Sequence, residues 1–160
     1  MIPKTTIENY TIRFAEEKDV PTILTFIKDL AEYEHLMSEV HATEELLLQY
    51  IFHEKKVEVI IGEYYNEPVG FALFFHNFST FLAKPGLFLE DLYVNPTMRG
   101  KGFGKELIAY IARLVEERGY GRMEWNCLDW NEPSIRFYKS LGAKPMDEWT
   151  SYRLQRDITQ

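Results

Sequence analysis

The segment from Gly86 to Glu106 constrains the fold most, because it joins an expected strand to an expected helix through a glycine-rich turn. Apolar and aromatic residues dominate up to Val94, and Asn95-Pro96 then ends the strand. Beyond the turn, apolar residues recur at helical spacing, and Gly119 stands where the helix should end. The segment therefore predicts strand, glycine turn and amphipathic helix in that order.

The turn itself is suited to an anion, because the first N–H groups of a helix have no partner within it and carry its positive dipole end. Gly102 and Gly104 leave room for an anion, and Arg99 adds a positive charge. A phosphate or pyrophosphate is the expected ligand, although a plain glycine-rich turn has the same composition. A Walker A motif is excluded because Glu106 follows the lysine, and a dinucleotide fingerprint is excluded because Lys105 replaces its third glycine.

Composition limits the class of protein. The chain of 160 residues, 46% of them hydrophobic, suits a single domain spanning 1–160. Eighteen basic against twenty-five acidic residues give a formal net charge of −7, which argues against nucleic acid or an anionic membrane as partner. Cys127 is the single cysteine, and no apolar run has the length of a signal peptide or a membrane span, so a cytoplasmic location is expected.

The rest of the chain predicts strands alternating with helices. Further strands are expected at 10–14, 57–61, 69–75 and 122–128, and further helices at 19–35, 43–52 and 131–142. The second and third of these strands should form a hairpin. We expect a loop at 76–85, more apolar than a solvated loop requires, and strands flanking a turn after Gly142. The order predicts an α/β (α+β) protein with one mixed sheet and helices on both faces.

Two motifs at family spacing carry a resemblance. Arg-x-x-Gly-x-Gly occupies 99–104, and Asn-Glu-Pro-Ser-Ile-Arg-Phe-Tyr-Lys-Ser-Leu-Gly-Ala occupies 131–143. Together they resemble the GCN5-related N-acetyltransferase (GNAT) superfamily. Leu-Glu-Asp-Leu-Tyr-Val at 89–94 and Ile-Lys-Asp-Leu-Ala-Glu-Tyr-Glu at 27–34 make the chain most similar to its spermidine/spermine and thialysine N-acetyltransferase branch. The resemblance implies the acyl-CoA N-acyltransferase fold, with about six to seven strands and four helices.

The same resemblance implies an activity. The enzyme would move the acetyl group of acetyl-CoA to a primary amine of a small diamine, polyamine or thialysine-like substrate, by direct attack in a ternary complex. It would be a homodimer and would use no metal, and the histidines indeed lack metal-binding spacing. A GNAT enzyme acting on a protein or antibiotic amine, and an acyl-CoA-binding module without turnover, remain alternatives.

The resemblance also assigns roles to matching positions. The acetyl and pantetheine portion would contact the main chain of Leu92, Tyr93 and Val94. The pyrophosphate would be held by Arg99, Gly100, Lys101, Gly102, Phe103, Gly104 and Lys105. Further cofactor contacts would come from Asn131, Glu132, Pro133 and Ser134. The amine would be lined by Tyr33, Glu34, Glu124, Trp125 and Asn126.

The chemistry requires two more groups. An alkyl ammonium, with a pKa near 10.4, must lose a proton before it attacks, and the departing thiolate, with a pKa near 8.5, leaves better when protonated. The resemblance implies that Glu90 faces the amine and that Tyr138 lies beside the sulfur, and we expect Glu90 to act through ordered water or in a desolvated site. Core packing is the competing interpretation of Tyr138, which has helical spacing with apolar neighbours. Asp91, on the opposite face of the strand, is expected to be structural.

Overall fold

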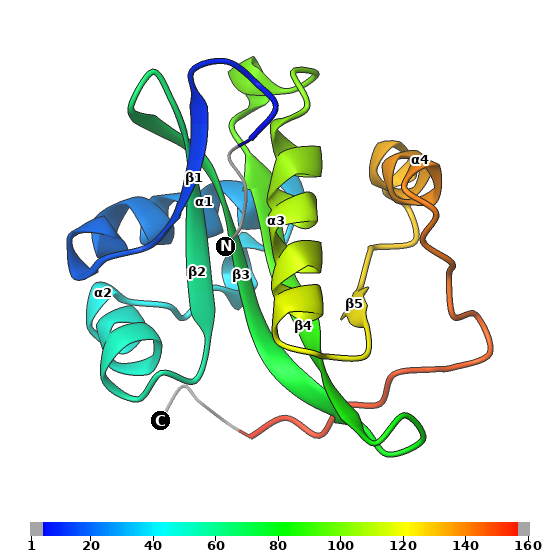
Figure 1. The fold of residues 1–160 in the computed structure, drawn as a ribbon. Coiled ribbons are helices and arrows are strands. Elements are labelled where there is room, and N and C mark those ends of the chain that lie inside the picture. The colour runs from blue at the N-terminus through cyan, green and yellow to red at the C-terminus, as the bar shows by residue number, and fades with distance from the viewer. Residues whose placement is uncertain (1–4, 157–160) are drawn as a thin grey trace. The chain divides into compact units, whose positions relative to one another are not determined.

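A computed structural model describes residues 5–156 of the chain (Figure 1). The chain divides into two compact units, residues 1–126 and residues 127–160, which are described separately below. No helix among the described residues combines the length and the apolar character that a membrane span requires. That the whole chain acts as one domain remains a prediction.

The first unit holds a mixed sheet of five strands in the order β1-β2-β3-β4-β5. Its strands are β1 (Tyr10–Phe14), β2 (Glu58–Tyr64), β3 (Glu67–Ser79), β4 (Lys84–Val94) and β5 (Met123–Trp125). The first four pair antiparallel, which confirms the predicted hairpin, and β5 runs parallel to β4. The mixed α/β class is confirmed, but the expected six to seven strands are wrong for the described residues, which form five.

Helices lie on both faces of this sheet, as predicted. They are α1 (Val20–Tyr33), α2 (Glu44–Leu47), which continues as a π-helical turn (Leu48–His53), and α3 (Phe103–Glu117). Figure 1 shows α1 and α3 on opposite sides of the strands. Phe26 of α1 packs on Phe71 of β3, with ring centroids 5.7 Å apart, in one apolar cluster. On the other face, Phe103 of α3 joins Tyr10 and Val69 in a second cluster.

The predicted start of the second helix is confirmed. The Thr43 hydroxyl accepts a hydrogen bond from the Leu46 N–H at 3.1 Å, which satisfies one of the unpaired donors of the first turn. The change to π-helical geometry after Leu47 was not predicted.

The expected loop at 76–85 is wrong. Strand β3 extends to Ser79 and β4 begins at Lys84, so only residues 80–83 turn the chain. Cross-strand pairing explains the difference, because Phe75 lies opposite Phe88 with ring centroids 5.3 Å apart, and aromatic pairs stabilise antiparallel strands. The expected strand at 122–128 is also shorter than predicted, since only Met123–Trp125 pairs with β4.

Within residues 127–156, the described part of the second unit, the one regular element is α4 (Glu132–Ser140). The Asn131 side chain accepts a hydrogen bond from the Ser134 N–H at 3.4 Å, and Gly142 adopts a φ of 89°, so both predicted ends are confirmed. The strands expected after Gly142 are wrong, because residues 143–156 form none. A strand needs a pairing partner, and the described residues supply none for this segment.

Candidate functional site

Strand β4 carries a β-bulge at the position predicted to be catalytic. Asp91 lies opposite Leu73 and Leu89 lies opposite Phe74, which leaves Glu90 as the extra residue. The Glu90 side chain is exposed. A bulge bends its strand and re-aims a side chain, and bulges are common beside active sites. The bulge therefore places the Glu90 carboxylate at a break in the regular ladder.

The bulge coincides with the end of the β4–β5 pairing. The parallel ladder joins Leu87, Phe88 and Leu89 to Met123, Glu124 and Trp125, and no later pair is formed among the described residues. Strand β4 nevertheless continues to Val94. On that side, the main chain of Leu92, Tyr93 and Val94 therefore has no strand partner among the described residues, and an unpaired strand edge is what an extended ligand can bind.

Three carboxylates gather around the bulge. Burial raises the pKa of Asp91 from 3.8 to about 7, and the charges of Glu90 and Glu34 add to the effect. Burial also raises the pKa of Glu34, again with a contribution from Glu90. The charge of Glu90 acts on both Asp91 and Glu34, which indicates that the three carboxylates lie in the same part of the first unit. A cation would relieve this repulsion.

Asp91 is thus a member of the candidate site, although the sequence favoured a structural role. In a regular strand, neighbouring side chains point to opposite faces of the sheet. The bulge interrupts this alternation between Glu90 and Asp91. In the sequence, the membership of Asp91 in the site was signalled only by two consecutive acids within an apolar strand. Among the described residues, no group of three or more acidic, histidine or cysteine side chains is arranged to hold a metal ion.

Arg99 lies over two aromatic rings, that of Tyr33 at the end of α1 and that of Tyr93 in β4. Its guanidinium carbon is 4.9 Å from the centroid of Tyr33 and 5.8 Å from that of Tyr93, and its Nε donates to the Val94 carbonyl at 3.0 Å. Tyr93 is buried, so its main chain rather than its ring is available to a ligand. The structure therefore connects a residue predicted to bind pyrophosphate with one predicted to line the amine site, Tyr33.

The glycine turn has the backbone that its sequence requires. Gly100 and Gly102 have φ values of 82° and 88°, which other residues adopt only with strain. Gly102 is the residue before α3, and the amides of Phe103, Gly104 and Lys105 follow as the first donors of the helix. The ring of Phe103 is buried, so of this residue only the main chain can face a ligand, whereas Lys101 and Lys105 are exposed. This arrangement suits an anion.

Of the amine-site candidates on the last strand, Glu124 already has partners. Its Oε1 accepts a hydrogen bond from Asn77 Nδ2 at 3.2 Å and lies 3.2 Å from Arg122 Nε. Trp125 pairs with Leu89, directly before the bulge, and Asn126 is exposed. Trp125 therefore lies nearer to the bulge along the ladder than Glu124 does.

The remaining candidates belong to the second unit. Asn131 is buried, and its side chain caps α4, while Glu132 and Pro133 are exposed in the first turn and Ser134 is half-buried. Tyr138 is half-buried on α4, with its ring centroid 5.5 Å from that of Phe137. The predicted pairing of Tyr138 with Glu90 stays a prediction.

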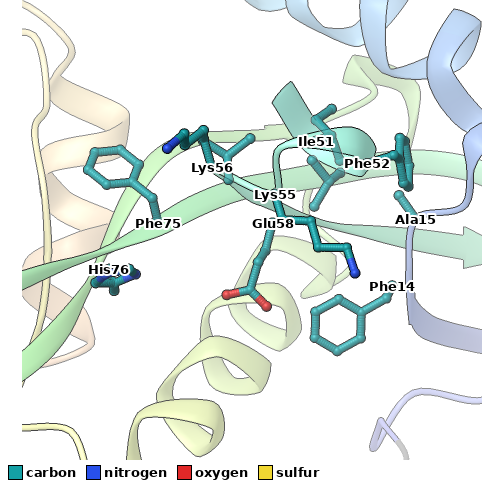
Figure 2. Close-up of a pocket in the computed structure, with 11 residues that line it drawn as sticks. Phe14, Ala15, Ile51, Phe52, Lys55, Lys56, Glu58, Phe75 and His76 are labelled. Carbon is teal, nitrogen blue, oxygen red and sulfur yellow. The ribbon is translucent and has the colours of Figure 1, made fainter. Parts of the chain in front are cut away.

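One hollow in the first unit lies outside these residues. It has a volume of about 320 Å³ and is lined by the π-helical turn, the start of β2 and the middle of β3. Figure 2 shows the rings of Phe14, Phe52 and Phe75 together with Lys55 and Glu58 at this hollow. No residue predicted to bind cofactor or amine lines it, so it is separate from the candidate site.

Comparisons with known proteins agree with the motifs. The model of the acetyltransferase (GNAT) family matches residues 22–143. Thialysine N-epsilon-acetyltransferase of Sus scrofa is 34% identical over 90% of this chain and 91% of its own. L-ornithine N5-acetyltransferase of Arabidopsis thaliana is 44% identical over 57% of this chain, and the match spans 40% of that relative. An integron cassette protein from the mobile metagenome of V. cholerae shares the fold with a TM-score of 0.76 and 25% identity, over 94% of this chain and 95% of that chain.

Proposed function

The chain belongs to the GNAT family of acetyltransferases and is an acetyl-CoA-dependent N-acetyltransferase; on that premise we propose that its acceptor is a primary amine of a small diamine, polyamine or thialysine-like molecule. The observation that carries the proposal is the group of three carboxylates, Glu34, Glu90 and Asp91, at the bulge of β4. A molecule with two amino groups can present one to the acetyl donor and leave the other, still charged, among these acids.

The names of the relatives support this acceptor class. Thialysine and L-ornithine are the acceptors named for two of them, and each molecule carries a second amino group besides the one acetylated. In our proposal Asp91 and Glu34 hold the charged amino group, with Tyr33 and Trp125 nearby as aromatic surface. Glu124 and Asn126 complete the amine-binding set as weaker candidates.

Acetyl-CoA supplies a thioester whose acetyl carbon is attacked and whose sulfur departs. We propose that the first amides of α3 and the glycine turn, 99–105, hold its pyrophosphate, because the turn is open and carries the positive dipole end. The free side of β4 would hold the pantetheine portion through the main chain of residues 92–94. Contacts from 131–134 of the second unit are proposed from the family motif.

The proposed chemistry is direct attack within a ternary complex. Glu90 accepts a proton from the substrate ammonium, through an intervening water, and the free amine forms the new C–N bond as the C–S bond breaks. Tyr138 gives a proton to the departing sulfur, and the second proton, which the nitrogen loses as it becomes an amide, returns the Tyr138 phenolate to its neutral form. An N–H of the main chain near Leu92 polarises the acetyl oxygen as negative charge develops there.

We also propose that the protein is cytoplasmic, acts as a homodimer, and needs neither nucleic acid nor a membrane. Phe78, Phe81 and Leu82 at the β3–β4 hairpin support the dimer, because they are exposed and apolar, with Phe81 98% exposed. Analytical ultracentrifugation tests this point, and a sedimentation mass of one chain would refute it.

The experiment that tests the proposed function is thiol release from acetyl-CoA with a panel of amines. The panel contains putrescine, spermidine, spermine, lysine, ornithine and thialysine. We expect amine-dependent release with at least one member. The absence of thiol release with every amine of the panel would contradict the acceptor proposal. Tight CoA binding without turnover on any amine would favour an acyl-CoA-binding module.

A further inference from the structure

Tyr10 of β1 contacts Phe103 at the end of the glycine turn, although the two residues are far apart in sequence. Its ring stacks on that of Phe103, the first residue of α3, with centroids 4.0 Å apart and planes 6° apart. Its hydroxyl donates a hydrogen bond to the Phe103 carbonyl oxygen at 3.2 Å. Both side chains are buried, Tyr10 to 2% and Phe103 to 1% exposure. One side chain therefore holds both the ring and the main chain of the residue that begins the helix.

The space for this phenol is provided by a glycine on the neighbouring strand. A Cβ at Gly62 would stand 2.2 Å from the Tyr10 hydroxyl oxygen, far inside van der Waals contact. Tyr64 closes another side of the Phe103 ring, with centroids 5.0 Å apart. Burial raises the pKa of Tyr10 well above its ordinary value, with a contribution from Glu106, so the hydroxyl remains a donor at any working pH.

The residues before Tyr10 reach the same turn. The Thr6 N–H and hydroxyl both donate to the Glu106 carboxylate in the first turn of α3. The Ile7 side chain lies 3.4 Å from where a Cβ of Gly102 would be. The Thr5 hydroxyl donates to the Tyr10 carbonyl oxygen, which fixes this segment onto β1. Residues 5–10 thus contact the turn at several successive points.

We propose that Tyr10 is a positioning residue for the cofactor: by fixing Phe103 it orients the first amides of α3 toward the pyrophosphate of acetyl-CoA. The inference rests on the proposed function of the turn. Two glycines with positive φ make the turn easy to deform, so an anchor at its end is needed to keep the amides convergent. A ligand that had to order the turn on binding would bind more weakly.

The test is Tyr10→Phe, which keeps the ring stack and removes only the hydrogen bond. One such bond accounts for roughly a two- to ten-fold change in an equilibrium constant. We expect the Kd for CoA, measured by calorimetry, and the KM for acetyl-CoA to rise by about that factor. The KM for the amine and kcat should stay within about two-fold of wild type, because the bulge is untouched.

Tyr110→Phe is the matched control. Tyr110 also lies on α3 and is half-buried, and its ring contacts Phe14 edge-on at 6.0 Å, away from the turn. This variant should bind CoA as the wild type does. A second variant, Gly62→Ala, should displace the Tyr10 phenol and weaken CoA binding in the same direction.

Each outcome decides between the claims. Unchanged CoA affinity in a folded Tyr10→Phe protein would overturn the positioning role while leaving the proposed function intact. A fall in kcat together with equal rises in both KM values and a lowered Tm would also overturn it, because such a pattern indicates general destabilisation. A wild-type protein that fails to bind CoA would contradict the proposed function itself, and this inference with it.

Discussion

Replacing Asp91 with asparagine tests the carboxylate group at the bulge through protein stability alone. The folded protein raises the pKa of this carboxyl from 3.8 to about 7, chiefly through burial and then through Glu90 and Glu34. The folded state therefore binds the proton more tightly than the unfolded chain does. The contribution of Asp91 to the free energy of unfolding is therefore greatest at low pH, and it falls as the pH rises from about 4 to about 7.

The magnitude follows from the two pKa values. Each unit of pKa difference corresponds to about 1.4 kcal/mol, and between pH 5 and pH 8 the linkage relation gives a loss of about 2–3 kcal/mol. The carboxyl is only partly buried, and solvent screens part of the interaction, so we expect about 2 kcal/mol in practice. This is a large share of the stability of an ordinary domain.

The assay is urea unfolding of wild type and Asp91→Asn at pH 5 and at pH 8. The wild type should lose about 2 kcal/mol more than the variant between these values, and the variant should be the more stable protein at pH 8. Asn keeps the size of the side chain, so packing is preserved. Parallel pH profiles for the two proteins would refute the carboxylate cluster as described.

Three further outcomes follow. Gly102→Ala should strain the turn by about 1–2 kcal/mol, because φ is 88° at this position, and should raise the KM for acetyl-CoA in steady-state kinetics. An unchanged KM would contradict the proposal that the glycine turn holds the pyrophosphate. Glu90→Gln and Tyr138→Phe should each lower kcat by roughly 100-fold or more while CoA still binds, and wild-type rates in both would remove these residues from the mechanism. Asp19→Asn should lower the free energy of unfolding by about 2 kcal/mol, because Asp19 is 5% exposed and binds Arg13 through two contacts of 2.7 and 2.8 Å; a change below 0.5 kcal/mol in urea unfolding would show the pair to be dispensable.

The elements that the sequence predicted correctly are those with a local signal. Thr43 and Asn131 mark helix starts through their own side chains, and Gly142 marks an end through its left-handed backbone. The glycine turn was located for the same reason. Each of these signals lies within a few residues of the feature that it determines.

The features that were missed depend on residues distant in sequence. The extension of β3 through His76 and Asn77 depends on pairing with β4, and the bulge at Glu90 depends on the register between these strands. The raised pKa of Asp91 depends chiefly on its burial in the folded chain, and then on Glu90 and on Glu34 at the end of α1. No local pattern specifies a register or the approach of a helix end. The candidate residues could therefore be named from sequence, but the membership of Asp91 could not.

The central claim is that the acids at the bulge select an acceptor with a second positive charge. Its most direct test compares kcat/KM for putrescine and for n-butylamine, which match in chain length and differ in one amino group, in wild type and in Glu34→Gln. We expect wild type to prefer putrescine by at least about ten-fold, equivalent to about 1.4 kcal/mol, and the variant to lose most of that preference. Equal kcat/KM values for the two amines in the wild type would contradict the account.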